Sequence, residues 1–127
     1  MELLEAFGGA FELNDDHLIL SPTALVAPAS YTVPGDASMA AFALLACTTT
    51  GRNITLIGWP NPQDAIGHEL LQSSSGVLGV HWNDELLTLA EANEPANLDL
   101  RDANDLLPPL AAVLAMNAGG CLTGAPH

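Results

Sequence analysis

The residues of this chain whose types could do chemistry are four histidines, two pairs of adjacent carboxylates and a run of three serines. No histidine has a histidine or cysteine partner at ligand spacing, so the sequence does not indicate a metal site. The pairs Asp15–Asp16 and Asp84–Glu85 fall at predicted hairpin turns, where exposure to solvent explains them. Ser73–Ser75 lacks the following helix and the lysine of a phosphate loop, and we interpret it as a helix end. The histidines are His17, His68, His81 and His127.

The charge balance limits the ligands that the chain could hold. Fifteen acidic residues stand against two basic ones, Arg52 and Arg101, and the formal net charge is -13. Nucleic acid and anionic membranes would be repelled, so neither is an expected partner. Phosphate and carboxylate substrates usually recruit several Arg or Lys side chains, so we expect this chain alone to bind them weakly. No cofactor is implied.

Length and composition favour one folded domain. The chain has 127 residues, of which 49% are hydrophobic and 13% charged, which excludes a disordered tail. No apolar run is long enough to span a bilayer and the start lacks the features of a signal peptide, so the expected location is the cytoplasm. Cys47 and Cys121 lie far apart and are expected to be free thiols, with Cys47 filling space in an apolar run.

The elements that would position any site can be read from the pattern. A helix over the first residues should stop at Gly8 and Gly9, and Asn14–Asp16 should turn a hairpin. The predicted strands are 10–13, 17–20, 53–58, 77–82, 85–90, 96–102 and the start of a last one at 121–123. The predicted helices are 37–48, one capped by Asn61 with Pro62 at its first position that ends near Gly76, and 106–118 with Pro108 and Pro109 in its first turn.

The helices at 37–48 and 106–118 have almost no polar face, whereas the strand at 96–102 alternates apolar and polar residues. A helix that is apolar all round is expected to be buried all round, and an alternating strand has one face in water. The amphipathic helix between them carries Ala65, Ile66, Leu70 and Leu71 on one face, which leaves His68 on the exposed face. The fold class is therefore α/β (α+β), with helices buried and sheets outside.

Several segments resemble one known family. VPGDASMAAFALLA at 33–46 is similar to the VPGDxSSAAF segment of 5-enolpyruvylshikimate-3-phosphate synthase, and NITLIGWPNP at 53–62 resembles the strand and turn that follow it there. DANDLLPPLAAVLAMNAGG at 102–120 resembles the family's Ala-rich helix, and LLEAFGGAFELNDDHLIL at 3–20 resembles its preceding helix and hairpin. A sister family that uses a UDP-sugar shares the fold, but VPGDAS followed by MAAF favours the shikimate enzyme.

The resemblance implies a fold and a site residue. The family folds as inside-out barrels of βαβαββ units, and the chain resembles a central portion of it, a partial enolpyruvyl transferase lobe over 1–127 with a possible internal boundary near 30–36. Asp105 matches the family's aspartate before the Ala-rich helix, which contacts the shikimate hydroxyl and is a candidate for proton transfer. The alternative is that Asp105 only caps the helix that begins at Leu106.

The sequence also departs from the family pattern. Met39 stands where a second serine is usual, and Gln63 and Asp64 stand where Thr and Arg are common. The Pro-Ser-Lys-Ser and Asn-Ala-Gly-Thr loops and the Lys-Glu-Ser-Asp-Arg stretch, which hold the family's cations, have no counterpart in these residues. We therefore expect a partial domain that is inactive alone, with shikimate 3-phosphate and phosphoenolpyruvate as ligands only in a complete enzyme. The alternative is a non-catalytic interaction module, or one half of a split enzyme, that pairs with a complementary chain or with itself.

Overall fold

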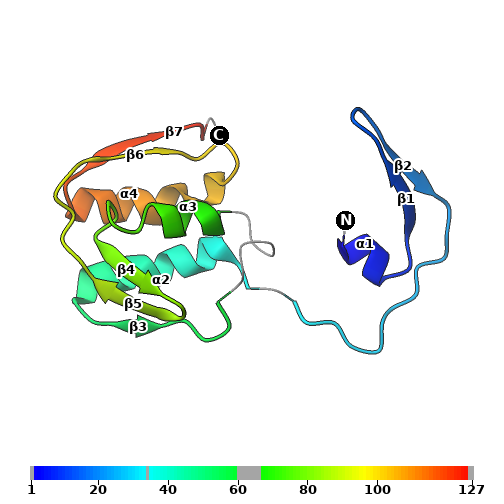
Figure 1. Ribbon diagram of the computed structural model, residues 1–127, viewed down its shortest axis with the longest axis horizontal. Helices are drawn as coiled ribbons and strands as arrows, with labels where there is room; N and C mark the ends of the chain where they lie inside the picture. The colour runs from blue at the N-terminus through cyan, green and yellow to red at the C-terminus, as the bar shows by residue number, and fades with distance from the viewer. Residues whose placement is uncertain (1, 34, 60–66, 126–127) are drawn as a thin grey trace. The chain divides into compact units, whose positions relative to one another are not determined.

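The computed structural model describes residues 2–33, 35–59 and 67–125. The chain forms two compact units, residues 1–33 and residues 34–127 (Figure 1). Each unit has its own helices and strands.

The first unit is a short helix followed by a hairpin. Helix α1 (Glu2–Ala6) is followed by Gly8, which is left-handed with φ of 74°. Strands β1 (Ala10–Leu13) and β2 (Leu18–Ser21) pair antiparallel. Asn14 Oδ1 accepts hydrogen bonds from the backbone N–H groups of Asp16 and His17 and shapes the turn. The predicted helix and hairpin are confirmed, with the second strand starting one residue later than predicted.

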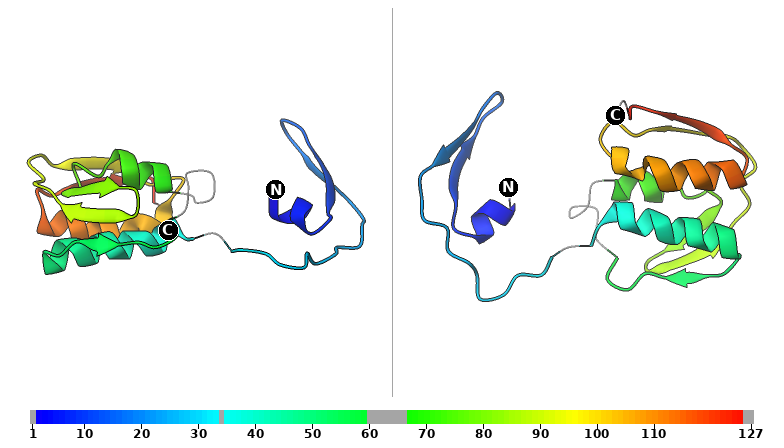
Figure 2. Two further views of the ribbon diagram at one scale, coloured as in Figure 1. Left: turned by 60° about the horizontal axis from the view of Figure 1, so that its bottom comes forward. Right: turned by 180° about the vertical axis from the view of Figure 1, so that it is seen from behind.

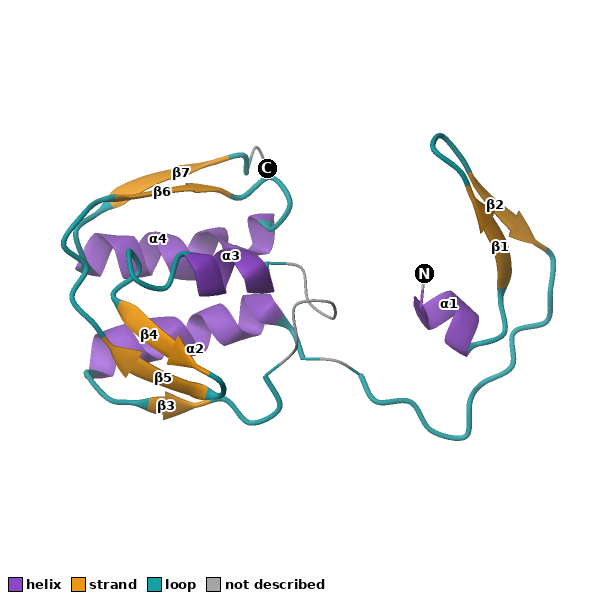
Figure 3. Cartoon of the chain, in the orientation of Figure 1, coloured by secondary structure: helices purple, strands orange, loops and turns teal. Residues whose placement is uncertain are grey.

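The second unit mixes helices and strands along its length, as Figure 3 shows, and the α/β class is confirmed. Its helices are α2 (Ala37–Thr50), α3 (His68–Ser73), the 3-10 turn η1 (Asn104–Leu106) and α4 (Leu107–Met116). Its strands are β3 (Ile54–Thr55), β4 (Val80–Asn83), β5 (Leu86–Leu89), β6 (Ala96–Asp99) and β7 (Gly120–Thr123).

Two small sheets border the helices of this unit. Strands β3, β5 and β4 form an antiparallel sheet in that order, and β6 and β7 pair in parallel with Leu98 opposite Leu122. Helices α2 and α4 pack against each other, with β6–β7 alongside α4 and the three-stranded sheet alongside α2 (Figure 1). The predicted alternation in β6 is confirmed, since Ala96 and Leu98 are buried while Asn97 and Asp99 are exposed.

The hydrophobic core joins both long helices to both sheets. Leu44 of α2 and Leu110 and Val113 of α4 are fully buried, together with Leu87 of β5 and Leu100 after β6. Pro108 and Pro109 lie in the first turn of α4, as predicted, where a missing N–H costs no helical hydrogen bond. Removing a buried leucine such as Leu110 should cost about 2–5 kcal/mol of unfolding free energy.

The prediction that α2 is buried all round is wrong. Ala37, Ala41, Leu44 and Cys47 are buried on one side, but Met39 is 63% exposed and Phe42 is 47% exposed on another. The reason is that α4 and the strands β3 and β5 cover only one face of the helix among the described residues. Helix α4 behaves in the same way, with Met116 half exposed at its end.

Several predicted boundaries differ from the structure, most of them by a few residues. Strand β3 is shorter than 53–58, because only Ile54 and Thr55 pair with β5. Thr55 lies opposite Leu86, where β5 begins, just after the turn at Asp84, which has φ of 49°. Helix α3 ends at Ser73 rather than near Gly76. The predicted cap at Asn61–Pro62 and the positions Ala65 and Ile66 lie outside the described residues.

Candidate active site

The two long helices of the second unit begin at the same end of that unit. Figure 1 and both views of Figure 2 show α2 and α4 side by side with their first residues at a common edge. Asp36 stands immediately before α2, and Asp105 stands in η1 immediately before α4. Two of the segments that carry the family resemblance, VPGDAS and the turn with Asp105, therefore lie at one edge, whereas Arg52 follows the far end of α2.

Asp36 caps the helix that it precedes, α2. Its Oδ1 accepts hydrogen bonds from the Ser38 backbone N–H at 2.8 Å and from the Ser38 hydroxyl at 2.6 Å, as a helix N-cap does. The hydrogen bond from the Ser38 hydroxyl is the main reason why the pKa of Asp36 is lowered from its usual value. At the other end, Gly51 closes the helix in the left-handed conformation, with φ of 68°. The VPGDAS segment therefore starts a helix.

Asp105 has no such structural task. It is exposed, and neither η1 nor α4 begins with a side-chain capping hydrogen bond, so the capping alternative is wrong. The sequence placed the helix start at Leu106, but the 3-10 turn comes first and takes Asp105 into its own first turn. A carboxylate that is exposed and not engaged in a cap is available to accept a hydrogen bond or a proton from a ligand.

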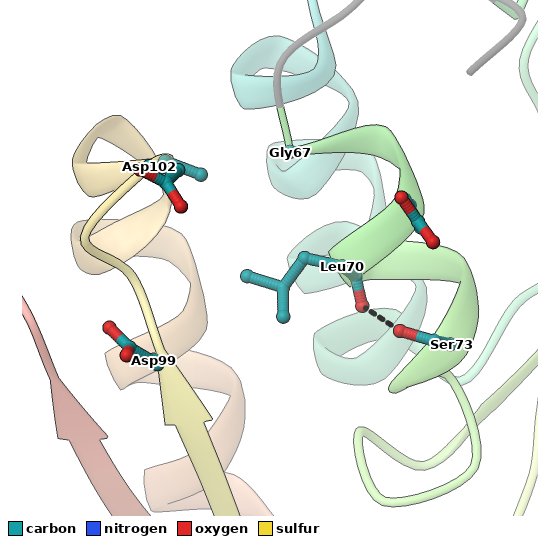
Figure 4. A pocket seen from close by; sticks show the side chains of 7 residues that line it. Gly67, Leu70, Ser73, Asp99 and Asp102 are labelled. Carbon is teal, nitrogen blue, oxygen red and sulfur yellow. Dashed lines mark hydrogen bonds between the residues drawn. The ribbon is translucent and has the colours of Figure 1, made fainter.

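A cavity of about 360 Å³ lies between α3 and the segment that leads to Asp105. Gly67, Glu69, Leu70 and Ser73 line it from one side, and Asp99, Asp102 and Ala103 from the other (Figure 4). The Ser73 hydroxyl donates to the Leu70 carbonyl oxygen across 3.3 Å and so faces its own helix. The three carboxylates would repel phosphate, so this cavity does not suit an anionic substrate by itself.

Gly67 sets how closely α3 approaches the turn that carries Asp105. Its φ is 87°, and an added Cβ would lie 2.9 Å from Leu106 Cδ1 and 3.2 Å from Ala103 Cβ. A larger residue would be strained at that φ and would press on the segment next to Asp105. No pattern in the sequence predicted this close approach.

Arg101, the cation nearest in sequence to Asp105, is already paired. Its guanidinium lies 2.7 Å from Asp99 Oδ2, and its backbone N–H donates to Asp99 Oδ1 at 3.0 Å. These hydrogen bonds lower the pKa of Asp99 from its usual value. Because Arg101 is 72% exposed, a ligand could recruit it, at the cost of its bond to Asp99.

The predicted position of His68 is wrong. The residue was expected on the exposed face of its helix, but it is 1% exposed and stacks on Trp59, with ring centroids 4.8 Å apart. Trp82 of β4 in turn packs against Trp59, with ring centroids 4.4 Å apart. The periodicity of a six-residue helix could not show this, because the tryptophans that bury His68 come from other parts of the chain.

The remaining chemical candidates have structural explanations. Asp15–Asp16 and Asp84–Glu85 lie at the two hairpin turns, as predicted, and Ser73 ends α3 with Ser74 as its C-cap. Cys47 is buried and Cys121 exposed, and both are free; burial raises the pKa of the Cys47 thiol. In residues 2–33, 35–59 and 67–125, no group of three His, Cys, Asp or Glu side chains could hold a metal ion.

Comparison with known proteins decides the family. The model of EPSP synthase (3-phosphoshikimate 1-carboxyvinyltransferase) matches residues 1–123. The chain belongs to the EPSP synthase family. A search of curated proteins found no match.

Membership in the EPSP synthase family supports enolpyruvyl transfer in the shikimate pathway at the level of the family. The match runs through both segments at the common helix edge, VPGDAS and the Asp105 turn. None of the helices that the structure describes is long and apolar enough to cross a membrane.

Proposed function

We propose that this chain is a partial EPSP synthase domain that supplies one catalytic carboxylate, Asp105, and is inactive alone. The parent reaction transfers enolpyruvyl from phosphoenolpyruvate to shikimate 3-phosphate and releases phosphate. The observation that carries the proposal is the edge where α2 and α4 both begin, because it brings together two segments of the family resemblance, VPGDAS and the Asp105 turn, and Asp105 makes no capping bond there.

The proposed fold is a segment of the family's inside-out barrel of βαβαββ units, with helices toward the barrel interior and sheets outside. Two features support it. The alternating strand β6 turns its polar residues to solvent, and the long helices carry apolar residues even where the described residues leave them uncovered. An apolar helix face with no cover is what a barrel wall would show when the rest of the barrel is supplied elsewhere.

Enolpyruvyl transfer needs a base, and Asp105 is the proposed one. As the hydroxyl of shikimate 3-phosphate adds to C2 of phosphoenolpyruvate, the hydroxyl proton must be removed and the methylene carbon gains a proton; phosphate then leaves with loss of a proton from that carbon, which restores the double bond. A positioned carboxylate can accept the hydroxyl proton. Asp105 is exposed and makes no capping hydrogen bond in the described part of the chain, so its oxygens can accept the proton of that hydroxyl. The first turns of α2 and α4 at the same edge add the positive ends of two helix dipoles, which favour anionic ligands.

The cations needed for the substrates are scarce. Both substrates are anionic, and the only Lys or Arg residues of the 127 are Arg52, beyond the far end of α2, and Arg101, paired with Asp99. We therefore propose that shikimate 3-phosphate and phosphoenolpyruvate bind only when Lys- and Arg-bearing segments of the family are supplied.

A phosphate-release assay with both substrates tests this. The purified chain is expected to release no phosphate above background, and release is expected when it is mixed with a purified fragment that carries the family's Lys- and Arg-bearing segments. Turnover by the chain alone would contradict the proposed inactivity. Failure of the mixture, with the two fragments shown to bind each other, would contradict the proposed partial domain.

A second function, a non-catalytic interaction module, is favoured by the exposed face of α2. Met39 and Phe42 lie three residues apart and so on one side of the helix, and both are about half exposed or more. Neighbouring apolar side chains that are exposed on one helix face can mark a contact with another protein. The partner would be a complementary chain or a second copy, in the cytoplasm.

Size-exclusion chromatography with light scattering distinguishes these cases. Self-association predicts a dimer that dissociates on dilution and is weakened by Met39→Gln with Phe42→Gln, while the matched surface change Thr49→Gln at the end of the same helix leaves it unchanged. A strict monomer at all concentrations that also binds no complementary fragment would contradict the interaction module.

A further inference from the structure

The buried histidine of α3 has unusual surroundings. His68 is 1% exposed, and neither Nδ1 nor Nε2 has a hydrogen-bond partner among the described residues. The indole N–H groups of Trp59 and Trp82 are likewise buried and unpaired there. Buried polar groups are normally hydrogen-bonded, so three such side chains, with His68 and Trp82 both against Trp59, call for an explanation.

We propose that Trp59, His68 and Trp82 form a pH-sensitive latch, which is closed while the His68 imidazole is neutral and opens when that imidazole takes up a proton. In the closed latch, Trp59 lies between His68 and Trp82 and joins the start of α3 to strand β4. A neutral imidazole packs against an aromatic ring as an apolar group does. An imidazolium there would carry an unsolvated charge.

The described elements around His68 offer no counter-charge. On α3 the neighbour is Glu69, which is exposed, and on β4 it is His81, also exposed. Helix α2 carries no charged residue, only the buried thiol of Cys47. Asp102 and Asp105, on the turn that meets Gly67, are exposed, and none of these groups forms an ion pair or hydrogen bond with His68 in the described part of the chain.

Two effects act on the charged form in opposite directions. Desolvation disfavours an imidazolium at this position, whereas the face of Trp59 would attract it through a cation–π interaction. Desolvation is the larger effect, and it lowers the pKa of His68 from its usual value of 6.5. A lowered pKa in the folded state means that the unfolded chain takes up the proton first, so stability is lost as the pH falls below about 6.5.

Opening the latch would change the packing of one wall of the cavity at the candidate active site. His68 is the first residue of α3, and Gly67, Glu69, Leu70 and Ser73 from this segment form one wall of the cavity beside the Asp105 turn. Gly67 also packs directly against Leu106. Release of His68 from Trp59 would therefore loosen that wall.

The test is the pH dependence of unfolding of the 127-residue chain. Between pH 7.5 and 5.5, uptake of one proton by the unfolded chain raises its unfolding equilibrium constant up to about tenfold. His68→Phe, which keeps an aromatic ring, is expected to abolish most of this rise. His81→Gln, which removes an exposed imidazole, is expected to keep it. The comparison cancels the titration of the carboxylates, which all three proteins share.

A second measurement does not depend on a variant that folds. A nitrogen-15 NMR titration of the wild-type imidazoles should show His68 neutral in the folded protein at pH values below 6.5, with Trp59 fluorescence changing only as His68 becomes charged. The proposal is overturned if His68 is protonated at or above pH 6.5 in the folded protein, if acidification stabilises the fold through His68, or if His68→Phe keeps the wild-type rise.

Discussion

Two aspartates stand before the two longest helices at the same edge of the second unit, and among the described residues only the first makes a capping hydrogen bond. Asp36 accepts two hydrogen bonds from Ser38 and caps α2, while Asp105 sits in η1 with no capping bond and an exposed side chain. The comparison shows that a residue in a family motif can serve the fold and need not serve the reaction. VPGDAS starts a helix that Asp36 caps, whereas Asp105 makes no capping bond among the described residues and is the carboxylate that we propose for catalysis.

The largest expected effect is on catalysis. In a complemented enzyme, Asp105→Asn removes the proposed base while keeping the size of the side chain, so phosphate release should fall by at least about 100-fold. The matched control is Asp84→Asn, at a turn with φ of 49° that asparagine tolerates, and it should keep the wild-type rate. Equal rates for the two variants would remove Asp105 from the mechanism.

The next effect is on stability. Asp36→Ala removes a side-chain cap and should lower the free energy of unfolding by about 1 kcal/mol. Asp105→Ala removes an exposed carboxylate without a cap and should change it by less than about 0.5 kcal/mol. Urea denaturation followed by circular dichroism measures both. If Asp105→Ala proved the more damaging, Asp105 would hold the fold after all.

The smallest effect is a pH dependence. Because the pKa of Asp36 is lowered, mainly by the hydrogen bond from the Ser38 hydroxyl, its contribution is present above the unfolded value of 3.8 and is lost as the pH falls through the folded value. The gap in urea midpoint between wild type and Asp36→Ala should stay constant from about pH 7 to 5 and shrink below about pH 4. A gap that widened in acid would show that the hydrogen bond does not favour the charged carboxyl.

Local patterns predicted much of the fold. The glycine stop at Gly8, the two hairpin turns, the prolines in the first turn of α4 and the alternation of β6 depend on neighbours in the chain, and the structure confirms each one. The family came from the same local segments, and its match over residues 1–123 confirmed it.

The predictions that failed depend on contacts between distant residues. His68 is buried by Trp59 and indirectly by Trp82, and neither lies on its helix. Met39 and Phe42 are as apolar as the buried face of α2, so composition could not tell which face α4 would cover. At the site, the sequence indicated Asp105 through the resemblance, but the 3-10 turn that prevents it from capping α4 appears only in the structure.

The most direct test compares Asp36→Ala and Asp105→Asn in the complemented enzyme, measuring phosphate release per folded molecule and the urea midpoint on the same preparations. We predict opposite outcomes: Asp105→Asn keeps its midpoint and loses turnover, and Asp36→Ala loses stability and keeps turnover per folded molecule. Loss of turnover in proportion to loss of stability for both variants would contradict the assignment of Asp105 as the catalytic carboxylate.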